Sequence, residues 1–229
     1  MKIKLVYTTE SMKEKQKMKE KVKEFIVKNL KWIILFICLI GFLAIAEDVF
    51  NKEIMMKDII GYKLVSTFLI SDFATPIAKF ITNFGGAIFL TILTIILFIL
   101  IKNKKIGVSI FSNLAIITAL NQLLKNILQR PRPTEYRIIE ETGYSFPSGH
   151  SMISMAFYGY LIYLIYKYVK NKYVKWTSMV LLSLLICSIG ISRIYLGVHY
   201  TSDVLGGFLI SISYLVIYIS AVNKFLIEK

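Results

Sequence analysis

The stretch SRIYLGVHYTSDVLGGFLISISYLVIYISAV, residues 192–222, joins two kinds of sequence. Its first twelve residues contain an arginine, a histidine and a carboxylate, whereas residues 204–222 carry no charged side chain. An uncharged run of this length is close to the ~20 residues with which a helix crosses the hydrocarbon core of a membrane. The stretch therefore predicts a transmembrane helix with chemically capable polar side chains at one end.

The same apolar pattern recurs along the chain, which is 56% hydrophobic. Because backbone groups in hydrocarbon must be satisfied within their own segment, helices are the expected spanning form. We expect an all-α polytopic bundle of six transmembrane helices, at residues 32–46, 86–101, 106–124, 151–166, 176–191 and 204–222. The run 106–124 should face the inside of the bundle because it carries Ser109, Ser112, Asn113, Thr118, Asn121 and Gln122.

Residues 47–85 combine apolar side chains at nearly helical spacing with charged ones. The apolar set is Val65, Leu69, Phe73, Ile77, Phe80 and Phe84, and the charged set is Asp58, Lys63, Asp72 and Lys79. Such a mixture predicts an amphipathic helix at the membrane interface rather than a seventh span. It would either pack against the bundle or form a lip for lipid entry.

The charge distribution predicts how the chain is oriented. Residues 1–31 form a basic leader with ten lysines and four glutamates, and residues 32–229 form the membrane domain. With six spans and a cytoplasmic N-terminus, the inner segments hold 19 of the 28 Lys and Arg and 5 of the 14 Asp and Glu, which is the whole excess of +14. This matches the positive-inside rule. Both termini should be cytoplasmic, and no base-reading motif suggests nucleic-acid binding.

His199 and Asp203 are the first candidate pair for chemistry. Four residues apart at a helix start, they share a face, so the carboxylate can accept a hydrogen bond from one imidazole nitrogen. The other nitrogen is then free to attack, and the carboxylate stabilises the cation that forms. The chain has only two histidines, and both lie in polar segments on the predicted outer side.

The second histidine, His150, ends the segment Pro147-Ser148-Gly149-His150, just before an apolar run. Ser148 can cap the helix and Gly149 lets the backbone approach an anion, which a helix N-terminus favours. His150 would then act as a general acid beside that anion.

Three cations, Lys125, Arg132 and Arg193, lie at predicted span ends on the same side. Arginine suits a multiply charged phosphoryl group through paired N–H bonds. The other charges of this region, Arg130, Arg137, Glu140 and Glu141, are interpreted as solvated loop charges outside the site.

The patterns K-x6-RP (Lys125, Arg132, Pro133), PSGH (147–150) and SR-x5-H-x3-D (Ser192, Arg193, His199, Asp203) resemble those of the type 2 phosphatidic acid phosphatase (PAP2) superfamily. This superfamily also includes vanadium haloperoxidases and glucose-6-phosphatase. The resemblance covers about residues 32–222 and is strongest to the bacterial membrane lipid phosphatases, which act on undecaprenyl diphosphate, phosphatidylglycerophosphate or phosphatidic acid.

The resemblance implies that His199, oriented by Asp203, attacks phosphorus and forms a phosphohistidine, and that His150 protonates the leaving oxygen. Lys125, Arg132, Arg193 and the Ser148–Gly149 backbone would hold the phosphoryl oxygens. We expect a lipid phosphatase at the outer face of the cytoplasmic membrane, without metal or other cofactor, acting on a membrane lipid phosphate and inhibited by vanadate. Two alternatives remain: a phosphotransferase using the same histidine, and a non-catalytic anion-binding protein or transporter. The sequence does not predict the oligomeric state.

Overall fold

The computed structural model describes residues 2–52 and 55–224, with side chains described at residue 18 and from residue 20 onward within these ranges. The described part contains helices and no strands, which confirms the all-α prediction. The helices are α1 (Lys2–Phe50), α2 (Met56–Leu69), α3 (Ala74–Asn83), α4 (Ala87–Leu100), α5 (Lys104–Leu128), α6 (Gly149–Tyr168), α7 (Lys172–Tyr195) and α8 (Thr201–Val222). Of the C-terminal tail expected on the inner side, residues 225–229 lie outside the described residues.

The helix α6 lies at the centre of the bundle and packs against α5, α7 and α8. It contributes Phe157, Tyr158, Tyr160 and Leu164 to the largest core cluster, in which α7 places Ile186 and Ile189. The buried hydroxyl groups of this helix are hydrogen bonded, as in the 2.8 Å bond from Tyr160 to the Ser109 hydroxyl of α5. Protein rather than lipid therefore covers most of α6.

Four described helices are long and apolar enough to cross a membrane singly, namely α5, α7, α8 and the part of α1 from Glu20 to Phe50. A fifth candidate is the pair α3 and α4, which meets the same criteria jointly and is bent by 49°. The fourteen residues of α4 are fewer than the ~20 that a span requires, so α4 depends on α3 for its length. All six apolar runs are helical over most of their length. By length and composition, four described helices meet the criteria for a span, or five with the bent pair, and six spans stay a prediction.

The single amphipathic helix predicted within residues 47–85 is wrong in its extent. The structure has two helices here, α2 and α3, with a break at residues 70–73. The second helix begins at Ala74, whose N–H donates a hydrogen bond to the Ser71 hydroxyl. Phe73, predicted on the apolar face, lies in the break and is 81% exposed. The second helix meets the criteria for a span only together with α4, to which a short break joins it.

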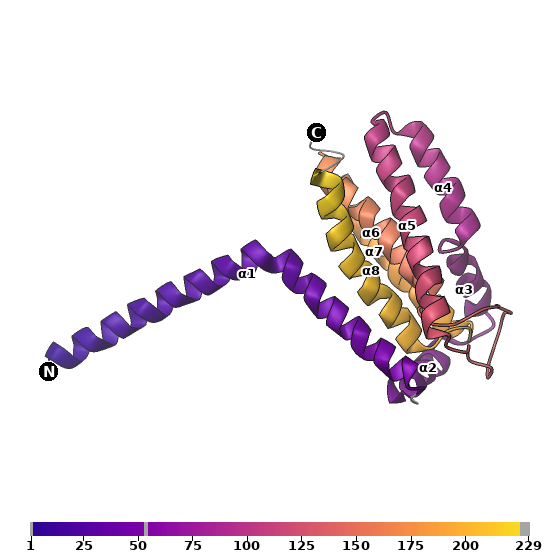
Figure 1. The fold of residues 1–229 in the computed structure, drawn as a ribbon, viewed down its shortest axis with the longest axis horizontal. Helices are drawn as coiled ribbons and strands as arrows, with labels where there is room; N and C mark the ends of the chain where they lie inside the picture. Colours follow the sequence, from indigo (N-terminus) through magenta and orange to yellow (C-terminus); the bar gives the residue numbers. More distant parts are fainter. Residues whose placement is uncertain (1, 53–54, 225–229) are drawn as a thin grey trace.

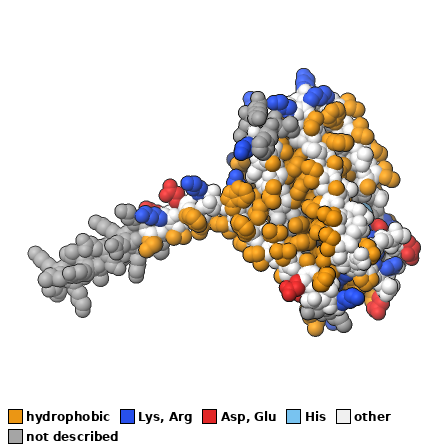
Figure 2. Space-filling model, viewed as in Figure 1, with side chains coloured by type: hydrophobic (Ala, Val, Ile, Leu, Met, Phe, Trp, Pro, Cys, Tyr) orange, Lys and Arg blue, Asp and Glu red, His pale blue; other side chains and the backbone are white. Residues whose placement is uncertain are grey.

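The helix α1 runs without interruption from the basic leader into the first apolar run. Its C-terminal half packs on α8, while its N-terminal part projects away from the bundle (Figure 1). The contact consists of Phe42, Ile45 and Val49 with Leu209 and other residues of α8. Figure 2 shows apolar side chains over the flank of the bundle and charged ones gathered toward its two ends.

The two ends of the bundle differ in their connections (Figure 1). One end has the short turns before α5 and α7, where Asn103 and Asn171 accept hydrogen bonds from Lys105 N–H and Val174 N–H and so cap the helices. The other end has α2, the long connection 129–148 and the N-termini of α6 and α8. The predicted site residues all come from this second end.

The polar face predicted for α5 is only partly inside the bundle. Ser109 and Asn113 are fully buried, Asn121 is 5% exposed, and Ser112 bonds the Tyr218 hydroxyl at 2.7 Å. Thr118 and Gln122 are exposed, against the prediction. Each of them follows a buried residue by one position along the helix, so its side chain is turned away from the buried face.

The close contact of α7 with α8 depends on a residue without a side chain. A Cβ at Gly190 would lie 2.6 Å from Phe208 Cζ and 2.9 Å from Val204 Cγ1. We expect Gly190→Leu to force the helices apart and to cost about 1–3 kcal/mol of stability. Tryptophan fluorescence during heating in detergent should show a lower unfolding temperature. Ser183→Leu, on the exposed face of α7, is the control and should leave it nearly unchanged.

Candidate active site

His199 and Asp203 meet where the chain turns from α7 into α8. His199 lies in the connection 196–200, and Asp203 lies in the first turn of α8. The Asp203 Oδ2 atom is 3.2 Å from His199 Nδ1 and accepts a 2.9 Å hydrogen bond from the Tyr200 N–H. Both side chains are almost fully buried, at 1% exposed for His199 and 0% for Asp203. The carboxylate is thus held by the helix start and faces one imidazole nitrogen.

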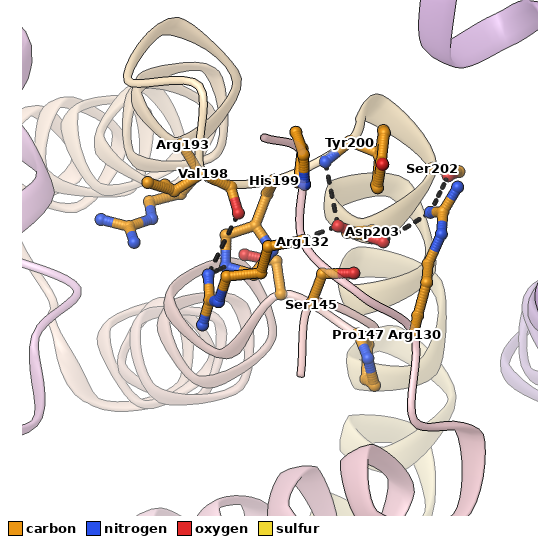
Figure 3. A network of polar contacts seen from close by, with 12 residues as sticks. Arg130, Arg132, Ser145, Pro147, Arg193, Val198, His199, Tyr200, Ser202 and Asp203 are labelled. Atoms are coloured by element: carbon orange, nitrogen blue, oxygen red, sulfur yellow. Dashed lines mark hydrogen bonds and ion pairs between the residues drawn. The ribbon is translucent and has the colours of Figure 1, made fainter. Parts of the chain in front are cut away.

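The other imidazole nitrogen faces an arginine (Figure 3). His199 Nε2 lies 3.0 Å from Arg132 Nη1. Because a guanidinium can only donate, Nε2 must accept, and the ring proton therefore resides on Nδ1 toward Asp203. Burial lowers the pKa of the His199 imidazole to about 4, although the hydrogen bond and charge of Asp203 oppose this shift. The arrangement yields a neutral imidazole with an unshared electron pair on Nε2.

The three predicted phosphate-binding cations converge on a single segment, residues 141–144. Lys125 donates to the Tyr144 carbonyl at 2.7 Å, and Arg132 donates to the carbonyls of Thr142 and Gly143 at 3.0–3.2 Å. Arg193 donates to the Glu141 carboxylate at 2.6 Å. One loop therefore supplies oxygen acceptors to all three cations.

Arg193 is 1% exposed, which makes it the largest fully buried side chain of the described residues. Its Nη1 donates to the Thr82 hydroxyl of α3 at 2.7 Å, and its Nη2 donates to Glu141. Its Nε is buried without a hydrogen-bond partner in the described part of the chain. A buried N–H of a charged group without a partner is costly, so this site can take an additional acceptor.

The segment PSGH begins α6 at the same end of the bundle. Ser148 occupies the N-cap position, but its hydroxyl caps no backbone N–H and instead accepts a 3.0 Å bond from the Ser151 hydroxyl. Its own N–H donates to the Asp203 carbonyl at 3.1 Å, which joins the starts of α6 and α8. The expected side-chain cap is therefore absent. The first N–H groups of α6 still lack partners within the helix, as at any helix start.

The remaining two residues of this segment pack against other helices. A Cβ at Gly149 would lie 3.1 Å from Asn121 Oδ1 of α5, so the absence of a side chain permits this approach. His150, in the first turn of α6, faces the break between α3 and α4, where a Cβ at Gly85 would lie 3.2 Å from its Cδ2. Both residues thus lie at the end of the bundle that holds His199.

Two of the four charges interpreted as solvated belong to buried networks, so that interpretation is wrong for them. Arg130 donates to Asp203 Oδ1 at 2.6 Å and to Asp58 Oδ2 at 2.7 Å, and its side chain is 11% exposed. Glu141 pairs with Arg193. Burial opposes ionisation of Glu141, but the charge and hydrogen bond of Arg193 outweigh it and lower the pKa of Glu141.

The other two charges, Arg137 and Glu140, pair weakly at 3.8 Å, with Glu140 91% exposed. Asp58 was also missed as a site residue. A single carboxylate in an apolar helix signals a buried partner, because an unpaired charge there is costly. Arg130 lies two residues before Arg132, and the two side chains contact different partners, Arg130 the Asp203 carboxylate and Arg132 the His199 ring.

A cavity lies beside His199. A cavity of about 710 Å³ reaches His199 and lies between α2 and the connections to α6 and α8. Its lining includes Tyr62 of α2 and Tyr136, whose rings stack at 5.1 Å. The described residues contain no cluster of three or more His, Cys, Asp or Glu side chains that could hold a metal ion.

The comparison with protein families covers the part of the chain that carries these motifs. The model of the PAP2 superfamily matches residues 106–227, more than half of the 229-residue chain. The chain belongs to the PAP2 superfamily. Phosphatidylglycerophosphatase B of Bacillus subtilis (strain 168) is 40% identical over 91 residues, which are 39% of this chain and 44% of the relative's length. The chain thus matches less than half the length of that relative.

Other PAP2 relatives match over longer stretches. Undecaprenyl-diphosphatase of Sulfolobus acidocaldarius is 25% identical over 193 residues, 80% of this chain and 86% of that protein. A crystal structure of a transmembrane PAP2-type phosphatidylglycerolphosphate phosphatase from Bacillus subtilis superposes with a TM-score of 0.74 at 26% identity, covering 83% of this chain and 96% of that one. Aquifex aeolicus LpxE shares the fold, with a TM-score of 0.59 at 23% identity over 73% of this chain and 99% of that one.

The geometry predicts the titration of His199. Because burial lowers its pKa to about 4, the ring should stay neutral, with its proton on Nδ1, from about pH 8 to about pH 5. This is measurable by NMR of protein labelled with ¹⁵N-histidine in detergent, where His150→Asn assigns the two rings. A titration midpoint near the ordinary value of about 6.5 would contradict the buried geometry.

Proposed function

We propose that this protein is an integral membrane lipid phosphatase that removes the terminal phosphate of a lipid phosphate or diphosphate through a phosphohistidine. The observation that carries the proposal is the environment of His199. Its Nδ1 faces a buried carboxylate, and its Nε2 lies 3.0 Å from Arg132, one of three cations gathered around a single loop. A neutral nucleophile next to clustered cations suits attack on a phosphoryl group.

In the proposed first step, the Nε2 electron pair of His199 attacks phosphorus, a P–N bond forms and the P–O bond to the lipid breaks. The imidazolium that forms keeps its proton on Nδ1 and donates it in a hydrogen bond to Asp203, whose negative charge stabilises the new positive charge. Burial and the charge of Arg193 hold the pKa of His150 well below its ordinary value, so the bound phosphate dianion must raise it before the ring takes up a proton. The protonated His150 then protonates the leaving oxygen, and the neutral ring takes a proton from the water that attacks phosphorus. Cleavage of the P–N bond releases inorganic phosphate and returns His199 to its neutral form.

The three cations hold the phosphoryl oxygens in this proposal. In the structure, the carboxylate of Glu141 and the carbonyls of residues 142–144 accept hydrogen bonds from them. Phosphoryl oxygens would replace these acceptors, and Arg132 would shift from His199 Nε2 to the phosphate. The unpartnered Nε of Arg193 supports such an exchange, because it adds a donor that the loop does not use. Ser148 and Gly149 add backbone donors at the start of α6.

The proposed topology has six spans, both termini in the cytoplasm and the site at the outer face of the cytoplasmic membrane. The charges support it, because the turn before α5 and the turn before α7 are basic and lie at the end opposite the site. A site at the mouth of a bundle suits a substrate whose tail stays in the bilayer. The cavity between α2 and His199 supports α2 as the lip over which such a lipid enters.

The proposed substrates are undecaprenyl diphosphate, phosphatidylglycerophosphate and phosphatidic acid. The names of the PAP2 relatives support the first two. We further propose that the reaction needs no metal, because the cations supply the charge that a metal would otherwise provide. A phosphotransferase that passes the phosphoryl group to another acceptor would use the same residues and is the alternative. A non-catalytic anion-binding protein or transporter, in which the same cations bind an anion without a reaction, is the second alternative.

The first experiment is phosphate release by the purified protein in detergent with EDTA, offered the three lipids in parallel. We expect release from at least one of them, inhibition by vanadate, and a loss of at least about 10³-fold in His199→Ala, which lacks the nucleophile. No release from any lipid without an added acceptor, but transfer to a supplied alcohol, would favour the phosphotransferase. Binding of lipid phosphate without either reaction would favour the anion-binding protein.

The exchange of loop acceptors for phosphate predicts a specific effect of Glu141. In Glu141→Gln the competing charge on Arg193 is removed, so vanadate should inhibit at a lower concentration. A net gain of about 1 kcal/mol corresponds to about fivefold. Glu140→Gln is the matched control, since the Glu140 side chain is 91% exposed. Equal or weaker inhibition of Glu141→Gln relative to this control would mean that Glu141 supports phosphate binding instead of competing with it.

A further inference from the structure

Five side chains, four of them buried and Arg130 11% exposed, form one continuous series from Asp58 of α2 through the candidate nucleophile to Arg132. Asp58 Oδ2 lies 2.7 Å from Arg130, and Arg130 lies 2.6 Å from Asp203 Oδ1. Asp203 lies 3.2 Å from His199 Nδ1, and His199 Nε2 lies 3.0 Å from Arg132. The two ends of the series belong to segments more than seventy residues apart in sequence. The family motifs account for its last three members and not for Asp58 or Arg130.

Arg130 is held on every side. Its Nη1 donates to Asp203 and, at 2.7 Å, to the Ser202 hydroxyl, while its Nη2 donates to Asp58. Its guanidinium carbon lies 4.0 Å from the centre of the Tyr200 ring, so it also stacks on an aromatic face. Burial opposes its charge, but Asp203 and Asp58 outweigh burial and raise the pKa of Arg130. A planar fork with this many fixed partners holds Asp203 in one orientation.

Asp58 connects the same end of α8 to α2. Its Oδ1 accepts the Ser202 N–H at 2.7 Å, and its Oδ2 accepts the Ser202 hydroxyl at 2.9 Å. One turn further along α2, the absence of a side chain at Gly61 permits close approach, because a Cβ there would lie 2.0 Å from Thr201 Oγ1. The position of α2 therefore determines where Asp58, and through it Arg130, can lie.

We propose that Arg130 and Asp58 are positioning residues that orient Asp203 and thereby His199, and that they couple phosphoryl transfer to the docking of the lip helix α2 on α8. This inference rests on the proposed function of His199 as the nucleophile. Neither residue touches the reacting atoms. Arg130 acts by holding the carboxylate that holds the imidazole, and Asp58 acts by holding Arg130.

The physical reason is geometric and electrostatic. A shift of the nucleophile of ~1 Å costs about a hundredfold in rate, and the 3.2 Å contact of His199 with Asp203 leaves the ring orientation dependent on where the carboxylate lies. The permanent charge of Arg130 also balances the charge of Asp203, so the carboxylate can be ionised while His199 stays neutral. Other charges that act on this pair are Arg132, Arg193, Lys125 and Glu141.

The test uses Arg130→Lys, Arg130→Gln and Asp58→Asn in the full chain, with Asp72→Asn as the matched control on an exposed carboxylate. Lysine keeps the charge of Arg130 but cannot bond Asp58 and Asp203 as a fork. We expect kcat for lipid phosphate hydrolysis to fall about 10- to 100-fold in both Arg130 variants. We expect a smaller fall of about 3- to 10-fold in Asp58→Asn and KM within about threefold of the unaltered protein in all three. The double variant Asp58→Asn with Arg130→Gln should be no slower than Arg130→Gln alone, since the two act as one unit.

A second readout reports on His199 directly. In ¹⁵N-histidine NMR, Arg130→Gln should lose the single Nδ1-protonated form of His199, and Asp72→Asn should retain it. Elution as a single species and a cooperative unfolding transition well above the assay temperature identify the folded variants, even where loss of a buried ion pair lowers that temperature. If Arg130→Gln does not fold, Arg130→Lys and Asp58→Asn carry the test.

The inference is overturned if the folded Arg130 and Asp58 variants keep kcat within about twofold of the unaltered protein, or if they raise KM with kcat unchanged. Failure of the proposed function looks different. In that case the unaltered protein releases no phosphate, yet the NMR state of His199 still responds to Arg130→Gln if the positioning series is correct. An unaltered His199 spectrum in Arg130→Gln would then overturn the inference independently of turnover.

Discussion

The buried carboxylate of Asp203 constrains the end of the bundle that holds the candidate site. Its side chain is fully enclosed, and an unpaired charge in such a place costs several kcal/mol. Its oxygens are therefore satisfied by Arg130, His199 and the Tyr200 N–H, while its backbone carbonyl accepts the Ser148 N–H. The starts of α6 and α8, the connection after α5 and the imidazole all meet at this one residue.

The same requirement explains the loop that runs past the cations. Positive charges in a partly dehydrated place need acceptors, and residues 141–144 provide them through one carboxylate and three carbonyls. The cations donate to these loop oxygens with the same N–H groups that would donate to a phosphoryl group in the proposed function. The cations can therefore exist as a preformed cluster before any anion arrives. In the proposed function, phosphate binding then exchanges the acceptors of cations that are already gathered.

In this PAP2 protein, the central helix is covered by other helices, whereas the outer helices present apolar faces suited to lipid. The central helix α6 carries serine and tyrosine hydroxyls that find partners on neighbouring helices, so it is not apolar enough to be a span by composition. The outer helices α1, α7 and α8 present long apolar faces instead. A polar central helix can bring His150 to the mouth of the bundle while the surrounding helices meet the demands of the bilayer.

By itself, the sequence determined the helical class, the approximate ranges of the six apolar helices and the residues of the three motifs, because apolar runs and local spacing depend on neighbouring residues alone. The placement of His199 against Asp203 also followed from spacing, since residues four apart share a helix face. Only the tertiary structure decided that Arg130, Asp58 and Glu141 are buried partners, that residues 47–85 form two helices, and that α3 and α4 form a bent pair. These features depend on contacts between segments distant in sequence, and whether a loop charge is solvated or buried depends on what packs over it.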